Sequence, residues 1–173
     1  MQKTKIKCKI CGREGHYQFQ CWQRPKKTKT RKYTSDNERK KLIKELDKYF
    51  SLYIRWYYAN PEGLDTCYTC GRTLPVYEAQ CGHYIKRGYY NTRWELSNCR
   101  VQCKVCNEYK GGNYSVYEPK IKRELGVDEV QKLWDKAYSR VKIPTYELDE
   151  KLKQLKQDYK HLIELRRKKG WKC

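Results

Sequence analysis

The sequence predicts a small α+β protein in which metal ions stabilise cysteine-rich units flanked by long helices. Most of the 10 cysteines lie in closely spaced groups near the N-terminus and in the middle of the chain. Apolar residues recur at helical spacing on both sides of the middle group. The Gly-punctuated segment between the helices is too short to bury a large core. Bound metal would therefore have to substitute for the missing hydrophobic stabilisation.

The charge of the chain indicates a polyanionic partner. The formal net charge is +20, and the first 34 residues carry eleven Lys or Arg against one acid, Glu14. Nucleic acid is the leading candidate because neutralising phosphates releases counterions. A solvated basic tail is the alternative, and a membrane surface is disfavoured. No apolar run approaches the ~18 residues of a spanning helix, and "MQKTKIKCKI" lacks the apolar core of a signal peptide. We therefore expect a cytoplasmic protein whose cysteines bind metal rather than form disulfides.

Residues 1–22 contain a compact metal-ligand motif. The stretch "CKICGREGHYQFQC" has the pattern Cys-x2-Cys-x4-His-x4-Cys, and three thiolates with one imidazole suit tetrahedral Zn²⁺. The expected ligands of this first zinc are Cys8, Cys11, His16 and Cys21. The spacing resembles the retroviral-type CCHC zinc knuckle, which implies binding of single-stranded nucleic acid through exposed aromatic rings. The candidate rings are Tyr17, Phe19 and Trp22. A purely structural knuckle or a protein contact is the alternative.

A linker and a long helix are expected next. Residues 23–34, "QRPKKTKTRKYT", have the polar, basic, Pro-marked composition of a linker, in which Lys26 and Lys27 are candidate DNA contacts. Residues 35–60 begin with the capping-box sequence "SDNE" and end before "NPEG". Between these signals an apolar stripe has helical spacing, formed by Leu42, Leu46, Tyr49, Tyr53 and Trp56. The pattern predicts a long amphipathic helix packed on the following domain.

Residues 61–116 hold the second group of cysteines and suit a small hairpin followed by a helix. "CYTC" and "CKVC" are two Cys-x2-Cys pairs that together supply a four-sulfur tetrahedron for a second structural zinc. Its expected ligands are Cys67, Cys70, Cys103 and Cys106. Three cysteines, Cys81, Cys99 and Cys173, are left over and are expected to be buried or unmodified thiols. Either Cys81 or Cys99 replaces a zinc ligand if this pairing is wrong.

Residues 117–173 are predicted to be helical. Helices are expected over residues 118–125, over residues 128–140 and from about residue 145, with Gly126 and Pro144 as the breaks. The last helix carries an apolar stripe with steps of four and three, formed by Leu148, Leu152, Leu155, Tyr159 and Leu162. This stripe is either a short coiled-coil seam or a surface packed within the monomer, and we favour the second.

Three polar residues around the second pair of cysteines form a recognisable constellation. His83 lies between the two pairs, Asn98 precedes the third zinc cysteine by five residues, and Asn107 directly follows the fourth. This arrangement resembles the HNH nuclease motif, or ββα-metal finger, a treble-clef-like fold. The resemblance implies that His83 is the general base and that Asn98 braces its loop. It also implies that His83 and Asn107 bind a catalytic divalent ion, Mg²⁺ or alternatively Mn²⁺.

One position departs from the common HNH pattern. Many enzymes of that superfamily have an aspartate directly before the histidine as a second metal ligand, whereas this chain has Gly82. The candidates to replace it are Gln80, Glu78, Glu95, Glu108 and a backbone oxygen. A degenerate, inactive finger is the alternative to an active one. Basic residues around the motif are the candidate DNA contacts, namely Lys86, Arg87, Arg93 and Lys110.

From residue 67 to about residue 134 the chain resembles the phage NinG family, the lambdoid Rap recombination endonucleases. The shared features are "CYTCG", "GHY", "RW", "QCKVCN" and "KGGN", and a glycine precedes the histidine in that family too. The resemblance implies a structure-selective DNA endonuclease that cuts branched recombination intermediates, such as Holliday junctions and D-loops, in the bacterial host cell. Symmetric cutting of a four-way junction needs two active sites, so a homodimer is expected.

Two other functions fit parts of the sequence. A non-catalytic, zinc-dependent protein that binds single-stranded nucleic acid would use the knuckle and the charge. It would leave the constellation of His83, Asn98 and Asn107 unexplained. An HNH nicking or restriction endonuclease with a sequence-defined target would use all three residues and would differ in its substrate.

Overall fold

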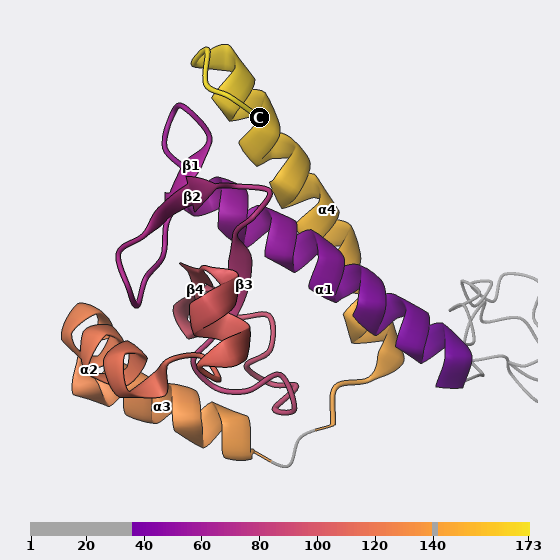
Figure 1. The fold of residues 1–173 in the computed structure, drawn as a ribbon. Coiled ribbons are helices and arrows are strands. Elements are labelled where there is room, and N and C mark those ends of the chain that lie inside the picture. Colours follow the sequence, from indigo (N-terminus) through magenta and orange to yellow (C-terminus); the bar gives the residue numbers. More distant parts are fainter. Residues whose placement is uncertain (1–35, 140–141) are drawn as a thin grey trace, which may run out of the picture. The chain divides into compact units, whose positions relative to one another are not determined.

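A computed structural model describes residues 36–139 and 142–173 of the chain (Figure 1). The predicted zinc knuckle and linker, with the candidate ligands and DNA contacts between residues 8 and 27, lie outside the described residues. The described helices are α1 (Asp36–Tyr58), α2 (Tyr114–Leu125), α3 (Val127–Tyr138) and α4 (Thr145–Lys168). The strands are β1 (Leu64–Thr66), β2 (Thr73–Pro75), β3 (Gln80–His83) and β4 (Cys99–Gln102). The short helical turns are η2 (Leu96–Asn98) and η3 (Val105–Tyr109).

Helices α1 and α4 pack side by side and run in the same direction (Figure 1). At their starts Arg39 Nη1 donates to the carbonyl oxygen of Ile143, 3.0 Å away. At their ends Arg166 Nη1 donates to the carbonyl oxygen of Ala59, 2.8 Å away. The buried apolar residues of the two helices are Leu46, Phe50, Ile54, Leu148, Leu152 and Leu155. Of the stripe predicted for α1 only Leu46 is buried, and its other members are partly buried. The stripe of the last helix therefore packs within the chain, as favoured from the sequence.

The short strands form two separate hairpins. Strand β1 pairs antiparallel with β2, and β3 pairs antiparallel with β4. In the second hairpin Gln80 is opposite Gln102 and His83 is opposite Cys99. The turn η3 follows β4 after two residues, so the order is strand, strand, helix. The sequence predicted a single hairpin in this region, because three-residue strands such as β1 carry too few alternations to be recognised.

Helices α2 and α3 cover a second, smaller core. Tyr84 and Ile85, just after β3, are buried against Tyr117 and Ile121 of α2 and against α3. Helix α2 begins four residues earlier than predicted and contains Pro119 within it. It ends before Gly126, which has a φ of 89°. Glycine adopts this positive φ without strain, and the residue forms the predicted break before α3.

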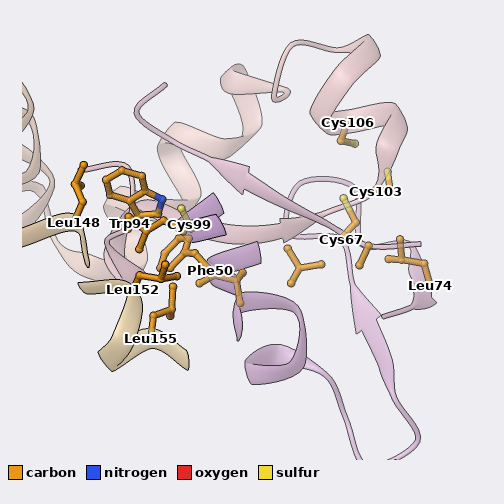
Figure 2. Packing of buried hydrophobic residues seen from close by; sticks show 14 residues of the cluster. Phe50, Cys67, Leu74, Trp94, Cys99, Cys103, Cys106, Leu148, Leu152 and Leu155 are labelled. Atoms are coloured by element: carbon orange, nitrogen blue, oxygen red, sulfur yellow. The ribbon is translucent and has the colours of Figure 1, made fainter. Parts of the chain in front are cut away.

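The larger core joins three of the predicted zinc ligands, Cys67, Cys103 and Cys106, to the helix pair. Figure 2 shows Cys67, Cys103 and Cys106 at one end of this core, with Trp94 and Leu148 at the other. The fold class is α+β, as predicted, with small sheets whose cysteine clusters could bind metal. In the described part of the chain, the helices are too short or too polar to span a bilayer.

Candidate metal centres and the surrounding site

The four predicted ligands of the second zinc come together. Cys67 and Cys70 lie between β1 and β2. Cys103 directly follows β4, and Cys106 lies in η3. Their sulfur atoms all lie within 4.8 Å of one another. Gly71, with a φ of 76°, closes the first turn through a 2.9 Å hydrogen bond to the carbonyl oxygen of Cys67. Four thiolates at this spacing fit tetrahedral Zn²⁺.

The backbone around this cluster favours the thiolate form of Cys67. Burial acts to raise the pKa of the Cys67 thiol, but the backbone N–H groups of Cys103 and Cys70 and the Thr69 hydroxyl outweigh it and lower the pKa to about 6. A thiol must lose its proton before it binds a metal ion, and this step costs little free energy when the thiol is already ionised near neutral pH. Asn113 Nδ2 also donates to Cys106 Sγ across 3.9 Å, as an outer-shell partner of a metal ligand does. The sequence motif "KGGN" contains this asparagine but does not reveal its partner.

Asn98 lies where a brace for the His83 loop would be. The residue is 0% exposed, and its Oδ1 accepts a 2.7 Å hydrogen bond from the backbone nitrogen of Ile85. Its Nδ2 donates to the carbonyl oxygens of Ile85 and Thr92 at 3.0 and 2.9 Å. One amide thus closes the loop between β3 and β4. Its effect on catalysis stays a prediction.

Asn107 lies beside two of the candidate substitutes for the missing aspartate. Its Nδ2 donates to Gln80 Oε1 across 2.7 Å, and Gln80 Nε2 in turn donates to the Glu108 carboxylate. Glu95 is instead paired with Lys136 at 2.8 Å. The hydrogen bond from Nδ2 leaves the Asn107 amide oxygen, the atom that would bind an ion, on the other side of the amide.

The space in front of Gly82 is filled by Gln102. A Cβ atom added to Gly82 would lie 2.1 Å from Gln102 Oε1, far inside van der Waals contact. Gln102 is 0% exposed, and its Nε2 donates to Thr69 Oγ1 and to the carbonyl oxygen of Gly112. Its Oε1 has no hydrogen-bond partner among the described residues. The packing of Gln102 therefore explains why position 82 is occupied by glycine. The sequence alone did not predict this contact, because strand register decides which side chains meet.

His83 faces the opposite side of the hairpin from Asn107. Successive side chains of a strand alternate, so Cys81 and His83 point to one face and Gln80 points to the other. His83 Nε2 lies 3.0 Å from the carbonyl oxygen of Arg93. Burial, together with the charge of Arg87, lowers the pKa of His83 below its usual range, so the ring is neutral at pH 7. A divalent ion that uses both His83 and Asn107 stays a prediction, since no contact joins these two side chains within the described residues.

A second group of metal-ligand side chains surrounds His83. The ligand atoms of Cys81, His83 and Cys99 lie within 4.8 Å of one another. Two cysteine-rich groups of described residues could therefore hold a metal ion such as zinc. The sequence contains the alternation Cys81, His83, but only the register of β3 and β4 adds Cys99 to the pair.

The predicted DNA contacts of this region divide into two kinds. Lys86, Arg87 and Lys110 are exposed and remain candidates for phosphate contacts. Arg93 instead pairs with Asp47 of α1, with its Nε 2.8 Å from Oδ1, and its Nη1 donates to the carbonyl oxygen of Arg87. Its guanidinium is thus engaged in holding the loop on α1.

The family model described as "Bacteriophage Lambda NinG protein" matches residues 2–168. No curated protein and no solved structure matches the chain.

Proposed function

The chain belongs to the bacteriophage lambda NinG family, and from this premise we propose that it is a metal-dependent, structure-selective DNA endonuclease. Its proposed substrates are branched recombination intermediates such as Holliday junctions and D-loops. Its proposed core is an HNH-type ββα-metal finger. The strand, strand, helix order of β3, β4 and η3, anchored by four cysteines at the helix end, supports that assignment.

The observation that carries the proposal is the oxygen-rich group on the helix that the cysteines anchor. Asn107 follows the zinc-type ligand Cys106 directly and lies in a hydrogen-bonded chain with Gln80 and Glu108. Amide and carboxylate oxygens are the ligands that Mg²⁺ prefers in proteins. A divalent ion held by Asn107 and Glu108 would polarise the scissile phosphate and stabilise the leaving oxygen.

The protein scaffold supplies the positioning in this proposal. Zinc bound to the four cysteines would fix the first turn of η3, and with it the backbone of Asn107. Asn98 would hold the loop that follows His83, through its hydrogen bonds to Ile85 and Thr92. The family resemblance also predicts that His83 acts as general base, and its neutral ring is in the protonation state that this role requires.

Selectivity for branched DNA is what the family resemblance implies, and the described surface suits binding that does not read base sequence. The exposed basic side chains Lys86, Arg87 and Lys110 suit phosphates, which carry no base sequence. The net charge of +20 adds affinity that does not depend on sequence. A homodimer, the predicted first zinc knuckle and single-strand binding belong to the same proposal.

Cleavage assays on four-way junction, flap, single-strand and linear duplex DNA test this function. Wild-type protein with Mg²⁺ should cut the branched forms, and Asn107→Ala should lower the rate by about two orders of magnitude. Gln154→Ala, a change on the exposed surface of α4, is the matched control and should cut normally.

Each alternative function has its own result in the same assay. Binding of all these DNAs without cleavage in Mg²⁺ or Mn²⁺ would favour a non-catalytic binding protein. Equal cutting of linear and branched DNA would remove the selectivity. Cutting at one defined sequence would favour an HNH nicking or restriction enzyme.

A further inference from the structure

Asp47 of helix α1 holds the loop that supplies the hydrogen-bond partner of His83. Its Oδ1 accepts from Arg93 Nε at 2.8 Å and from the indole Nε1 of Trp94 at 3.0 Å, and its Oδ2 pairs with Arg93 Nη2. We infer that Asp47 is a positioning residue for the general base His83, because it fixes the backbone carbonyl that receives the proton of His83 Nε2. This role rests on the proposed function and extends it to a helix outside the unit of β3, β4 and η3.

The peptide group between Arg93 and Trp94 is held from both of its ends. Its carbonyl oxygen is the atom that lies 3.0 Å from His83 Nε2. The side chains on either side of it, those of Arg93 and Trp94, donate to the same Oδ1 of Asp47. A planar peptide group whose two flanking side chains are fixed has little freedom to turn its carbonyl away. Asp47 therefore decides where this oxygen lies, although in the described part of the chain it is not itself hydrogen-bonded to the His83 ring.

The ion pair between Arg93 and Asp47 suits the task of an anchor. The side chains of Arg93 and Asp47 are only 13% and 26% exposed. Two N–H groups of one guanidinium bind the two carboxylate oxygens, which fixes direction as well as distance. The guanidinium carbon also lies 5.2 and 5.5 Å from the ring centres of Tyr90 and Trp94. The pair therefore holds the loop on α1 in one conformation.

The brace formed by Asn98 does not replace this anchor. Asn98 Nδ2 donates to the carbonyl oxygen of Thr92, which is one residue before that of Arg93. The two rotatable backbone dihedral angles of Arg93 lie between these two carbonyl groups, so fixing the first leaves the second free to turn. Asn98 closes the loop, and Asp47 orients the carbonyl that faces His83.

The neutral ring of His83 has two carbonyl groups beside it and only one proton to donate. Nε2 lies 3.0 Å from the Arg93 oxygen, and Nδ1 lies 3.3 Å from the Cys81 oxygen. Because a carbonyl oxygen only accepts hydrogen bonds, the two oxygens compete for this proton. The shorter contact favours Nε2–H and leaves on Nδ1 the lone pair that a general base needs. Loss of the Arg93 contact would favour Nδ1–H, and the remaining lone pair would then face the loop.

Nitrogen NMR of the full chain, labelled with ¹⁵N-histidine and with its zinc retained, tests this tautomer without DNA. Spectra are recorded at pH 8, where the ring is neutral, and His83→Gln assigns the signals. The wild type should show a protonated Nε2 and an unprotonated Nδ1 at His83. In Asp47→Ala the proton should move in part to Nδ1, so that the two nitrogen shifts approach each other.

Glu45→Ala is the matched control for the NMR experiment. It removes an exposed ion pair with Lys156 from the same helix and should keep the wild-type shifts of His83. A proton on Nδ1 in the wild type, or wild-type shifts in Asp47→Ala, overturns the inference.

The kinetics of junction cleavage with Mg²⁺ give a second readout. In Asp47→Ala kcat should fall about tenfold or more with little change in KM, because a misplaced base slows the chemical step and leaves DNA binding intact. Asp47→Asn keeps the size of the side chain, covers the case in which Asp47→Ala does not fold, and should also lower kcat. Wild-type kcat in a folded Asp47 variant overturns the inference. Absence of cleavage by the wild type contradicts the proposed function instead, and the NMR result then still decides the role of Asp47.

Discussion

Gln102 Oε1 occupies the space into which a side chain at Gly82 would have to grow. The distance from this oxygen to an added Cβ is only 2.1 Å, and the Gln102 side chain is held in place by two hydrogen bonds. The aspartate that many HNH enzymes carry at this position therefore does not fit unless Gln102 moves. The presence of glycine instead of aspartate at position 82 is thus explained by the packing of Gln102 between β3 and β4.

Gly82→Ala should therefore destabilise the fold by about 1–3 kcal/mol, because the buried Gln102 has to leave its partners. Gly88→Ala is the matched control, since a Cβ there meets nothing within 4 Å. Chemical denaturation with zinc present measures both variants. Equal stability of Gly82→Ala and Gly88→Ala would show that Gln102 does not fill this space.

Asp65 predicts a pH dependence of stability. It is 1% exposed, and both carboxylate oxygens lack a hydrogen-bond partner among the described residues. Burial raises its pKa from 3.8 to about 7, against the opposing effect of Arg55 and Arg166. The folded state thus binds this proton more tightly than the unfolded state. The stabilisation that the protonated Asp65 carboxyl contributes is fully present below its pKa in the unfolded chain, and it is lost as the pH rises toward 7.

Asp65→Asn should remove this loss. The variant should be more stable than wild type at pH 8 by up to about 4 kcal/mol, and similar to it at pH 4. Glu62→Gln, at an exposed neighbouring position, is the control and should show no such difference. Denaturation curves at both pH values, with saturating zinc, measure the effect. A constant difference between Asp65→Asn and wild type across pH would contradict the assignment.

Asn98→Ala should destabilise the loop between β3 and β4. The substitution leaves the backbone nitrogen of Ile85 and the carbonyl oxygens of Ile85 and Thr92 without their partner in the interior. We expect a loss of about 3 kcal/mol. Asn91→Ala is the control, because Asn91 makes its hydrogen bonds to Ser139 at the exposed surface. Thermal unfolding measures both, and a similar Tm for the two variants would argue against the brace.

Local patterns predicted the parts of the fold that depend on nearby residues. The long helix was readable from its capping signal and apolar stripe, and the structure places α1 at Asp36–Tyr58. The spacing of two Cys-x2-Cys pairs was enough to predict the four-cysteine cluster, because such pairs commonly supply the four ligands of a tetrahedral zinc site. Gly126 marked the break between α2 and α3, since its positive φ suits glycine.

The parts that the sequence did not predict depend on strand register. Gln102 meets Gly82, and Cys99 meets His83, only because β3 and β4 pair as they do. A shift by one residue would exchange the two faces of the hairpin. The alternation Cys81, His83 was visible in the sequence, but its third partner was not. The short strands β1 and β2 carried too little pattern to be recognised.

The rate of junction cleavage in the presence and absence of Mg²⁺ tests the central claim most directly. Purified wild-type protein, with its zinc retained, is incubated with a four-way junction and with a linear duplex of the same sequence. The account predicts that the junction is cut only when Mg²⁺ is added and that the duplex is cut far more slowly. A junction that is bound but stays intact in both Mg²⁺ and Mn²⁺ would contradict the proposed endonuclease.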